Sequence, residues 1–219
     1  MPVDMSLPAD ASSPPGDASA PPADTSVAPD LLPLSPAVVV NGSNQRERHG
    51  SGSGGTESNE VCPGNQVLIG FRGVENVEDP TAIGIQRLAV VCGALTAVAG
   101  NMDYPIQTEL TGTLTERGRG GGTAFDMLCP DNEVVIRISG NSGSSLDRLQ
   151  AHCGRLSVAS DRQTVTVTTG ATLTARGLAE APAYDDPCPA GQVARGGLIR
   201  AGQWVDAFTM ICGTPAGVP

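Results

Sequence analysis

The stretch AGQWVDAFTMICG, residues 201–213, places a glycine, the chain's only tryptophan (Trp204) and an aspartate (Asp206) before an alternating apolar segment that ends in a cysteine. A second copy, SGSSLDRLQAHCG at residues 142–154, has a glycine, an aspartate and a cysteine at the same spacing. Apolar residues at alternate positions predict a β-strand with one buried face. The two copies therefore predict a repeated strand that follows a turn ending in aspartate.

The whole of residues 37–219 has this repeat. Its strand-like segments IQRLAVVCG, LDRLQAHCG and VDAFTMICG end in cysteines that are 61 and 59 residues apart, and each follows a segment that starts with Cys-Pro. We expect repeats at about 37–97, 98–158 and 159–219, each with about four short antiparallel strands, and find no 3.6-residue period for a helical array. Two sets of equivalent positions should face the core: Leu88, Leu149 and Phe208, and Val90, Ala151 and Met210.

The six cysteines permit fifteen connectivities. Their regular layout favours one local pair in each repeat, at the base of a hairpin: Cys62–Cys92, Cys129–Cys153 and Cys188–Cys212. Disulfides of this kind are typical of an oxidising, extracytoplasmic compartment. A zinc site is the alternative, but the chain has no Cys-x-x-Cys and only two histidines. We therefore expect no metal site.

Composition narrows the class of protein. The net charge is −10, and all 13 basic residues are arginines, which argues against nucleic acid or an anionic membrane as partner. No apolar run is long enough to span a bilayer. Residues 1–36 hold nine of the 18 prolines and five aspartates, so we expect a disordered acidic spacer. The N-terminus shows no signal peptide, so with disulfides expected, either the signal lies upstream or this is a mature form.

The turn motif resembles that of the jacalin-related lectins, whose β-prism I fold is shared with vitelline membrane outer layer protein I. GQWVDAF (202–208) matches the lectin pattern Gly-x-aromatic-x-Asp, whereas GSSLDRL (143–149) has Ser145 at the aromatic position. GSGSGG (50–55) and GRGGG (118–122) resemble the family's glycine-rich loop. The first repeat departs from the lectin pattern and resembles the vitelline membrane protein, with Gln86 at the position of the aspartate.

This resemblance implies an all-β, β-prism I fold: three antiparallel Greek-key sheets with a pseudo-threefold internal repeat, here preceded by the disordered tail. It also implies that the tip of one repeat shares a sheet with the glycine loop of the next. Asp206 would then meet Gly52–Gly55, Asp147 would meet 176–186, and Gln86 would meet Gly120–Gly122. Only the first combination keeps both halves, so one complete site and two degraded sites are expected.

The residue types suit a sugar. A carboxylate accepts charge-assisted hydrogen bonds from hydroxyls, a tight loop supplies backbone N–H donors, glycine permits close approach, and an indole offers a stacking surface. The expected site consists of Asp206, Trp204, Gln203, Val205, Gly202, Gly54 and Gly55, and Asp147 belongs to a degraded one. We expect a non-catalytic, lectin-like protein without cofactor, secreted or tethered to the cell surface, that binds glycans or a cell-surface polysaccharide; its oligomeric state stays open.

Other interpretations stay open at this stage. A structural or adhesive β-prism without a sugar site is the alternative, because an aspartate at a hairpin tip is often only a turn-former. We expect Asp206 to be exposed at its tip. Glu78/Asp79 and Asp185/Asp186 lie beside prolines and are interpreted as solvated turns, and His49 has no visible Asp or Ser partner for catalysis.

Overall fold

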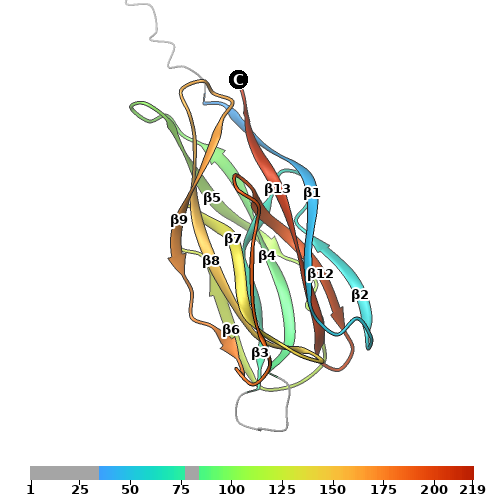
Figure 1. Ribbon diagram of the computed structural model, residues 1–219. Helices are drawn as coiled ribbons and strands as arrows, with labels where there is room; N and C mark the ends of the chain where they lie inside the picture. The colour runs from blue at the N-terminus through green and yellow to red at the C-terminus, as the bar shows by residue number, and fades with distance from the viewer. Residues whose placement is uncertain (1–34, 77–83) are drawn as a thin grey trace, which may run out of the picture. The chain divides into compact units, whose positions relative to one another are not determined.

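The computed structural model describes residues 35–76 and 84–219, which form an all-β fold of three antiparallel sheets (Figure 1). Sheet A has the strand order β1 (Ala37–Gly50), β13 (Val205–Val218), β12 (Val193–Ala201), β2 (Thr56–Val61). Sheet B has the order β5 (Tyr104–Thr113), β4 (Ile85–Ala97), β3 (Val67–Glu75), β6 (Thr123–Leu128). Sheet C has the order β9 (Val165–Thr172), β8 (Leu146–Val158), β7 (Glu133–Ser142), β11 (Ala183–Pro187), and the short β10 (Arg176–Gly177) also pairs with β8. Sheets B and C join where Tyr104 and Pro105 of β5 pair with β8.

The sheets share one topology. Each has a central hairpin, β12–β13, β3–β4 or β7–β8, with one outer strand on either side. In sheet B the consecutive strands β3, β4 and β5 form a meander and β6 returns beside β3, which is a Greek key. Sheet A is completed by both ends of the described chain, so that β1 and β13, blue and red in Figure 1, lie side by side. The predicted all-β, three-sheet fold with a pseudo-threefold repeat is confirmed.

Each sequence repeat contributes to two sheets. Residues 37–97 supply the outer strands β1 and β2 of sheet A, followed by the central hairpin β3–β4 of sheet B. The next repeat supplies the outer strands of sheet B and the central hairpin of sheet C in the same way. The tip of a hairpin and the loop between the two outer strands beside it therefore come from different repeats. This arrangement creates the candidate site described below.

The disulfides are Cys62–Cys92, Cys129–Cys153 and Cys188–Cys212, the pairs expected from the layout. Their position differs from the expected hairpin base. The backbone N–H of Cys62 donates to Arg195 O of β12 over 2.8 Å, so this cysteine continues the outer strand of sheet A, whereas Cys92 lies in β4 of sheet B. The bridge therefore ties two neighbouring sheets together, as the other two bridges do between sheets B and C and between C and A.

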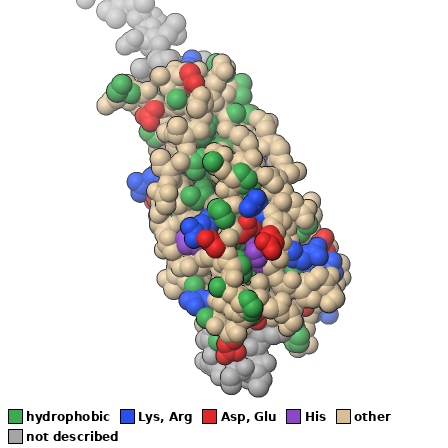
Figure 2. All heavy atoms as spheres, in the orientation of Figure 1, with side chains coloured by type: hydrophobic (Ala, Val, Ile, Leu, Met, Phe, Trp, Pro, Cys, Tyr) green, Lys and Arg blue, Asp and Glu red, His purple; other side chains and the backbone are tan. Residues whose placement is uncertain are grey.

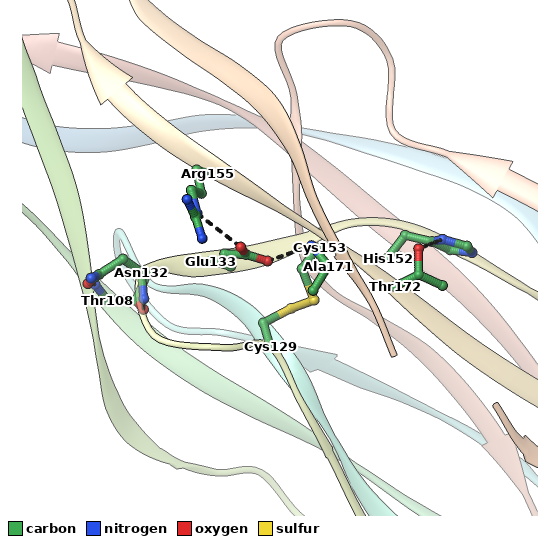
Figure 3. The surroundings of a disulfide bond; sticks show 9 residues. All are labelled: Thr108, Cys129, Asn132, Glu133, His152, Cys153, Arg155, Ala171 and Thr172. Atoms are coloured by element: carbon green, nitrogen blue, oxygen red, sulfur yellow. Dashed lines mark hydrogen bonds and ion pairs between the residues drawn. A yellow bond between two sulfur atoms is a disulfide. The ribbon is translucent and has the colours of Figure 1, made fainter. Parts of the chain in front are cut away.

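Figure 3 shows the surroundings of the bridge between sheets B and C. Glu133, whose side chain is 3% exposed, accepts a hydrogen bond from Arg155 Nε over 3.0 Å and another from the Ala171 N–H over 2.8 Å. The carboxylate therefore fastens β9 to the central hairpin beside the Cys129–Cys153 bridge. A buried carboxylate that is both paired and hydrogen-bonded holds its place without a bare charge in the core.

The core lies where the apolar faces of the three sheets meet. The positions expected to face inward are all fully buried: Leu88, Leu149, Phe208, Val90, Ala151 and Met210. Phe71 of sheet B packs edge-on against Phe208 of sheet A, with ring centroids 5.5 Å apart. Phe125, the third phenylalanine of the chain, is buried as well, and the rest of the interior consists mainly of aliphatic side chains with methionines and the disulfides.

Two expectations concern segments outside the described residues. The spacer expected at 1–36 lies outside them except for residues 35 and 36, and so does the acidic pair Glu78/Asp79. Within the described residues, no helix that is long and apolar enough to cross a membrane is present.

Candidate sugar-binding site

The tip of the central hairpin in sheet A carries the motif residues. It joins β12 to β13, with the Gly202 N–H donating to Trp204 O over 3.1 Å across the turn. Gln203 is exposed, Trp204 is half-buried and Val205 is fully buried in the core. The turn therefore presents Gln203 and part of the Trp204 side chain to solvent, while Val205 anchors its base in the core.

Asp206 is the second residue of β13, directly after this turn, and is only 8% exposed. The expectation of an exposed tip aspartate is therefore wrong. The loop between β1 and β2 covers the residue: the Ser51 N–H donates to Asp206 O over 2.9 Å, and the carboxylate lies against Gly54. The loop comes from the first repeat and Asp206 from the last, so the structure places the expected halves of the site next to each other.

The loop needs glycines because its backbone lies very close to the tip of sheet A. Gly54 has φ +92°, and a Cβ there would lie 2.9 Å from Asp206 Oδ1. A Cβ on Gly55 would lie 2.2 Å from the carbonyl carbon of Ala201. Because both positions exclude a side chain, the loop packs with its bare backbone on the tip.

The carboxylate of Asp206 is incompletely satisfied. Its Oδ2 atom is buried and has no hydrogen-bond partner among the described residues. Burial raises the pKa of Asp206, while hydrogen bonding by the Gly202 N–H, the positive charge of Arg200 and the Trp204 side chain act in the opposite direction. No donor therefore meets hydrogen-bond geometry at Oδ2, although the Gly202 N–H and the Trp204 side chain lie near enough to the carboxylate to favour its charged form.

The equivalent tip in sheet C is fully satisfied. Asp147 Oδ2 accepts from the Gly143 N–H over 3.0 Å, and Oδ1 accepts from the Ser145 hydroxyl over 2.8 Å. Its facing segment contributes a backbone bond from Leu178 N to Asp147 O, over 2.8 Å, but has no pair of glycines. The Ser145 hydroxyl thus donates to the Asp147 carboxylate, at the position where the tip of sheet A has Trp204.

The tip in sheet B has an amide in place of the carboxylate. Gln86 lies against the second glycine loop, where a Cβ on Gly120 would lie 1.9 Å from Gln86 Oε1. Each tip thus meets the loop expected for it, and only the tip of sheet A combines a carboxylate with paired glycines.

One contact of the second glycine loop was not foreseen from the sequence. The N–H groups of Arg119 and Gly120 both donate to Gln203 O, over 2.8 and 2.7 Å. The loop is thereby fastened to the tip of sheet A, and a cavity of about 620 Å³ lies between them. The residues lining it are Gly55, Thr56, Ser58, Glu116, Arg117, Gly118, Arg119, Ala201, Gly202 and Gln203.

The surroundings of His49 and Asp186 also differ from the expectation. His49 Nε2 lies 3.3 Å from Asp186 Oδ2, and its ring stacks on Tyr184 with centroids 3.9 Å apart. Asp186 is 4% exposed and also accepts from Arg46 Nε over 3.0 Å. The histidine therefore has an acidic partner, and Asp186 is a buried strand residue rather than a solvated turn. The cluster joins β1 of sheet A to β11 of sheet C.

A serine–histidine pair also occurs on sheet C. Ser139 Oγ lies 2.8 Å from His152 Nε2, while Nδ1 of the ring faces Thr172 Oγ1 over 3.1 Å. Nucleophilic catalysis of the triad kind needs a carboxylate at that second nitrogen to orient the imidazole. A threonine hydroxyl there makes the pair a cross-strand contact. Within the described part of the chain, no group of acidic, histidine or cysteine side chains is arranged to hold a metal ion.

Comparison with known proteins finds similarity only among solved structures. A mannose-binding jacalin-related lectin from Ananas comosus is 17% identical over 78% of this chain and 98% of its own, with a TM-score of 0.48. Malaysian banana lectin is 17% identical over the same shares, with a TM-score of 0.46. Calsepa lectin, in complex with a biantennary N-glycan, is 14% identical over 80% and 98%, with a TM-score of 0.42. No protein-family model and no curated protein sequence matches the chain.

Proposed function

We propose that the protein is a non-catalytic carbohydrate-binding protein whose sugar site is the tip of sheet A with its covering glycine loop. The observation that carries this proposal is Asp206 Oδ2, a buried carboxylate oxygen without a partner, beside a loop that has no side chains at Gly54 and Gly55. Buried acceptors are paired in most structures, so an unpaired one calls for an explanation. A sugar hydroxyl is the donor that we assign to it.

The rest of the tip supplies what a sugar ring needs. The half-buried indole of Trp204 offers a stacking face, and the backbone of Gln203–Asp206 offers polar groups at the rim. The Gly52–Gly55 loop must shift for a hydroxyl to reach Oδ2, because that atom is buried. The loop is held by the Ser51 N–H on Asp206 O and by Arg200 Nη1 on Gly54 O, so the bound sugar has to compensate for the contacts that a shift of the loop breaks.

One site is proposed rather than three. Asp147 has both carboxylate oxygens bonded within its own turn, so a sugar there would have to break existing hydrogen bonds. Gln86 carries no charge, and neutral hydrogen bonds are about half as strong as charge-assisted ones. The disulfides favour an oxidising compartment, which suits a secreted or surface-tethered protein that binds glycans.

A structural β-prism remains the second candidate function, and one observation favours it. Asp206 is buried and already interacts with the Gly202 N–H and the Trp204 side chain, as a residue that only fixes the turn would. The fully bonded Asp147 shows that such a turn is stable with no ligand. On this alternative the tip closes the end of the sheet and binds nothing.

The test compares Asp206→Asn with Asp147→Asn in the full 219-residue chain on an array of neutral and acidic glycans. Both changes remove one charge at the same position of a hairpin tip, so they are matched. We expect the wild type and Asp147→Asn to bind the same glycans, and Asp206→Asn to lose about 2–3 kcal/mol of affinity, because charged hydrogen bonds are the strong ones. A wild type that binds no glycan would leave the structural alternative in place.

A further inference from the structure

The cavity beside the tip of sheet A has two different walls. One wall is β2 with the tip, from Thr56 and Ser58 to Gln203, and the other is residues 116–119 of the second repeat. Its volume of about 620 Å³ falls within the range of small-molecule sites, about 300–1,000 Å³. Because Gly55, Gly202 and Gln203 line it, the cavity is continuous with the proposed sugar site.

The walls are fixed by internal bonds. Gln203 O holds the loop through the N–H groups of Arg119 and Gly120. Arg117 Nε donates over 2.6 Å to Glu60, a carboxylate that is 4% exposed, at the inner end of β2. The cavity is therefore held open by contacts between sheets A and B.

Among the charged side chains that line the cavity, one arginine is not paired with an acidic residue of the described chain. Glu116 pairs with Arg87 over 2.7 Å, and Arg117 pairs with Glu60. Arg119 is exposed, and its guanidinium has no ion-pair or hydrogen-bond partner among the residues that the structure describes. Within the described ranges nine arginines form ion pairs, and on the face drawn in Figure 2 several arginine and acidic side chains lie beside one another.

We propose that this cavity is an extended subsite for an acidic sugar residue, whose anionic group is bound by Arg119. The inference rests on the proposed function and specifies its ligand class: a glycan that carries a carboxylate or a sulfate ester next to the residue held at the tip. A guanidinium binds either group through two parallel hydrogen bonds. Thr56 and Ser58 place hydroxyls on the opposite wall for the ring hydroxyls of the same sugar.

Because the whole protein is acidic, binding of an acidic glycan depends on the local positive charge of Arg119. At −10 the protein repels polyanions in general, so an acidic glycan needs a specific cation at its contact point. Removing the Arg119 guanidinium should therefore abolish the preference of the subsite for acidic over neutral sugars. Salt should weaken binding of the acidic ligand and leave the neutral ligand unaffected, because screening acts on exposed charges.

The experiment titrates the full chain with hexuronic-acid oligosaccharides, with the same oligosaccharides after carboxyl reduction, and with a sulfated galactan fragment beside its desulfated form. Arg119→Gln is the test variant. Arg72→Gln is the control, because Arg72 is an exposed arginine of β3 whose partner, Asp126, lies outside the cavity. We expect wild type and control to bind one anionic form about tenfold more tightly than its neutral counterpart, and Arg119→Gln to bind both alike.

The set of ligands distinguishes a carboxylate from a sulfate as the bound group, and it separates failure of the subsite from failure of the proposed function. A preference for the carboxylate or for the sulfate identifies the anionic group, and both support the subsite. Equal binding of neutral and acidic forms, with binding abolished in Asp206→Asn, overturns the subsite and leaves the proposed function intact. A preference that persists in Arg119→Gln overturns it as well. Binding of neither probe also overturns it, while the glycan array decides separately whether the tip binds any sugar.

Discussion

Gly54→Ala tests whether the glycine loop packs on the Asp206 carboxylate. An alanine at φ +92° is in the left-handed region, which costs an L-residue about 1–2 kcal/mol. Its Cβ would also lie 2.9 Å from Oδ1 of Asp206, closer than real Cβ atoms approach, and 3.1 Å from Cγ, which is a tight contact. Moving the loop by a few tenths of an ångström breaks its contact with the tip. We therefore expect a loss of about 2–3 kcal/mol of unfolding free energy in total.

Gly121→Ala is the matched control, because Gly121 lies in the second glycine loop and a Cβ there would meet nothing within 4 Å. Differential scanning calorimetry should show a melting temperature about 4–12 °C lower for Gly54→Ala, at about 2–4 °C per kcal/mol for a chain of this size. The control should melt within about 2 °C of the wild type. If both variants melt together with the wild type, the loop does not pack on the carboxylate, and the geometry of the site is refuted.

Three further outcomes are expected. Because burial raises the native pKa of Asp206 above its ordinary value, the native state binds that proton more tightly than the unfolded chain does; the stability that this contributes is present below the unfolded pKa and is lost as pH rises through the native pKa. Urea unfolding should accordingly show Asp206→Asn gaining stability relative to wild type from about pH 4 to 7; a falling difference would contradict the sign. Replacing Cys129 and Cys153 together by serine should cost about 3 kcal/mol in the same assay, and an unchanged midpoint would show that the bridge adds nothing. Asp186→Ala should cost about 3 kcal/mol, because it leaves His49 buried without its acidic partner, and a loss below about 1 kcal/mol would show that the cluster is not coupled.

The core positions and the repeat were predictable because they depend on patterns within short stretches of sequence. One face of each strand is apolar with a period of two, and three copies in the same phase identify the same inward positions three times, as in Leu88, Leu149 and Phe208. The cysteines carry the same phase. Which sheet each first cysteine joins was not readable, because Cys62 follows a strand of sheet A and precedes one of sheet B.

The juxtaposition of the candidate residues was predictable but their burial was not; that they form a sugar site stays a prediction. The resemblance of the turn motif identified Asp206 and the glycines, and the cyclic exchange of strands between sheets brings them together. The depth of Asp206 was missed, because it depends on how closely a loop from the other end of the chain covers it. His49 and Asp186 are 137 residues apart in sequence, and no local pattern links them. The contact of Arg119 with Gln203 was missed for the same reason.

Trp204 offers the most direct test of the central claim, that the tip of sheet A binds a sugar. It is the only tryptophan in the chain, half-buried at the tip, so its emission reports on that site alone. The full chain is titrated with the glycan that gives the strongest array signal, and fluorescence is recorded beside calorimetric heat. We expect a saturable change in Trp204 emission with the same affinity as the heat, present in Asp147→Asn and absent in Asp206→Asn. Saturable heat without a change in emission would place binding elsewhere and contradict it.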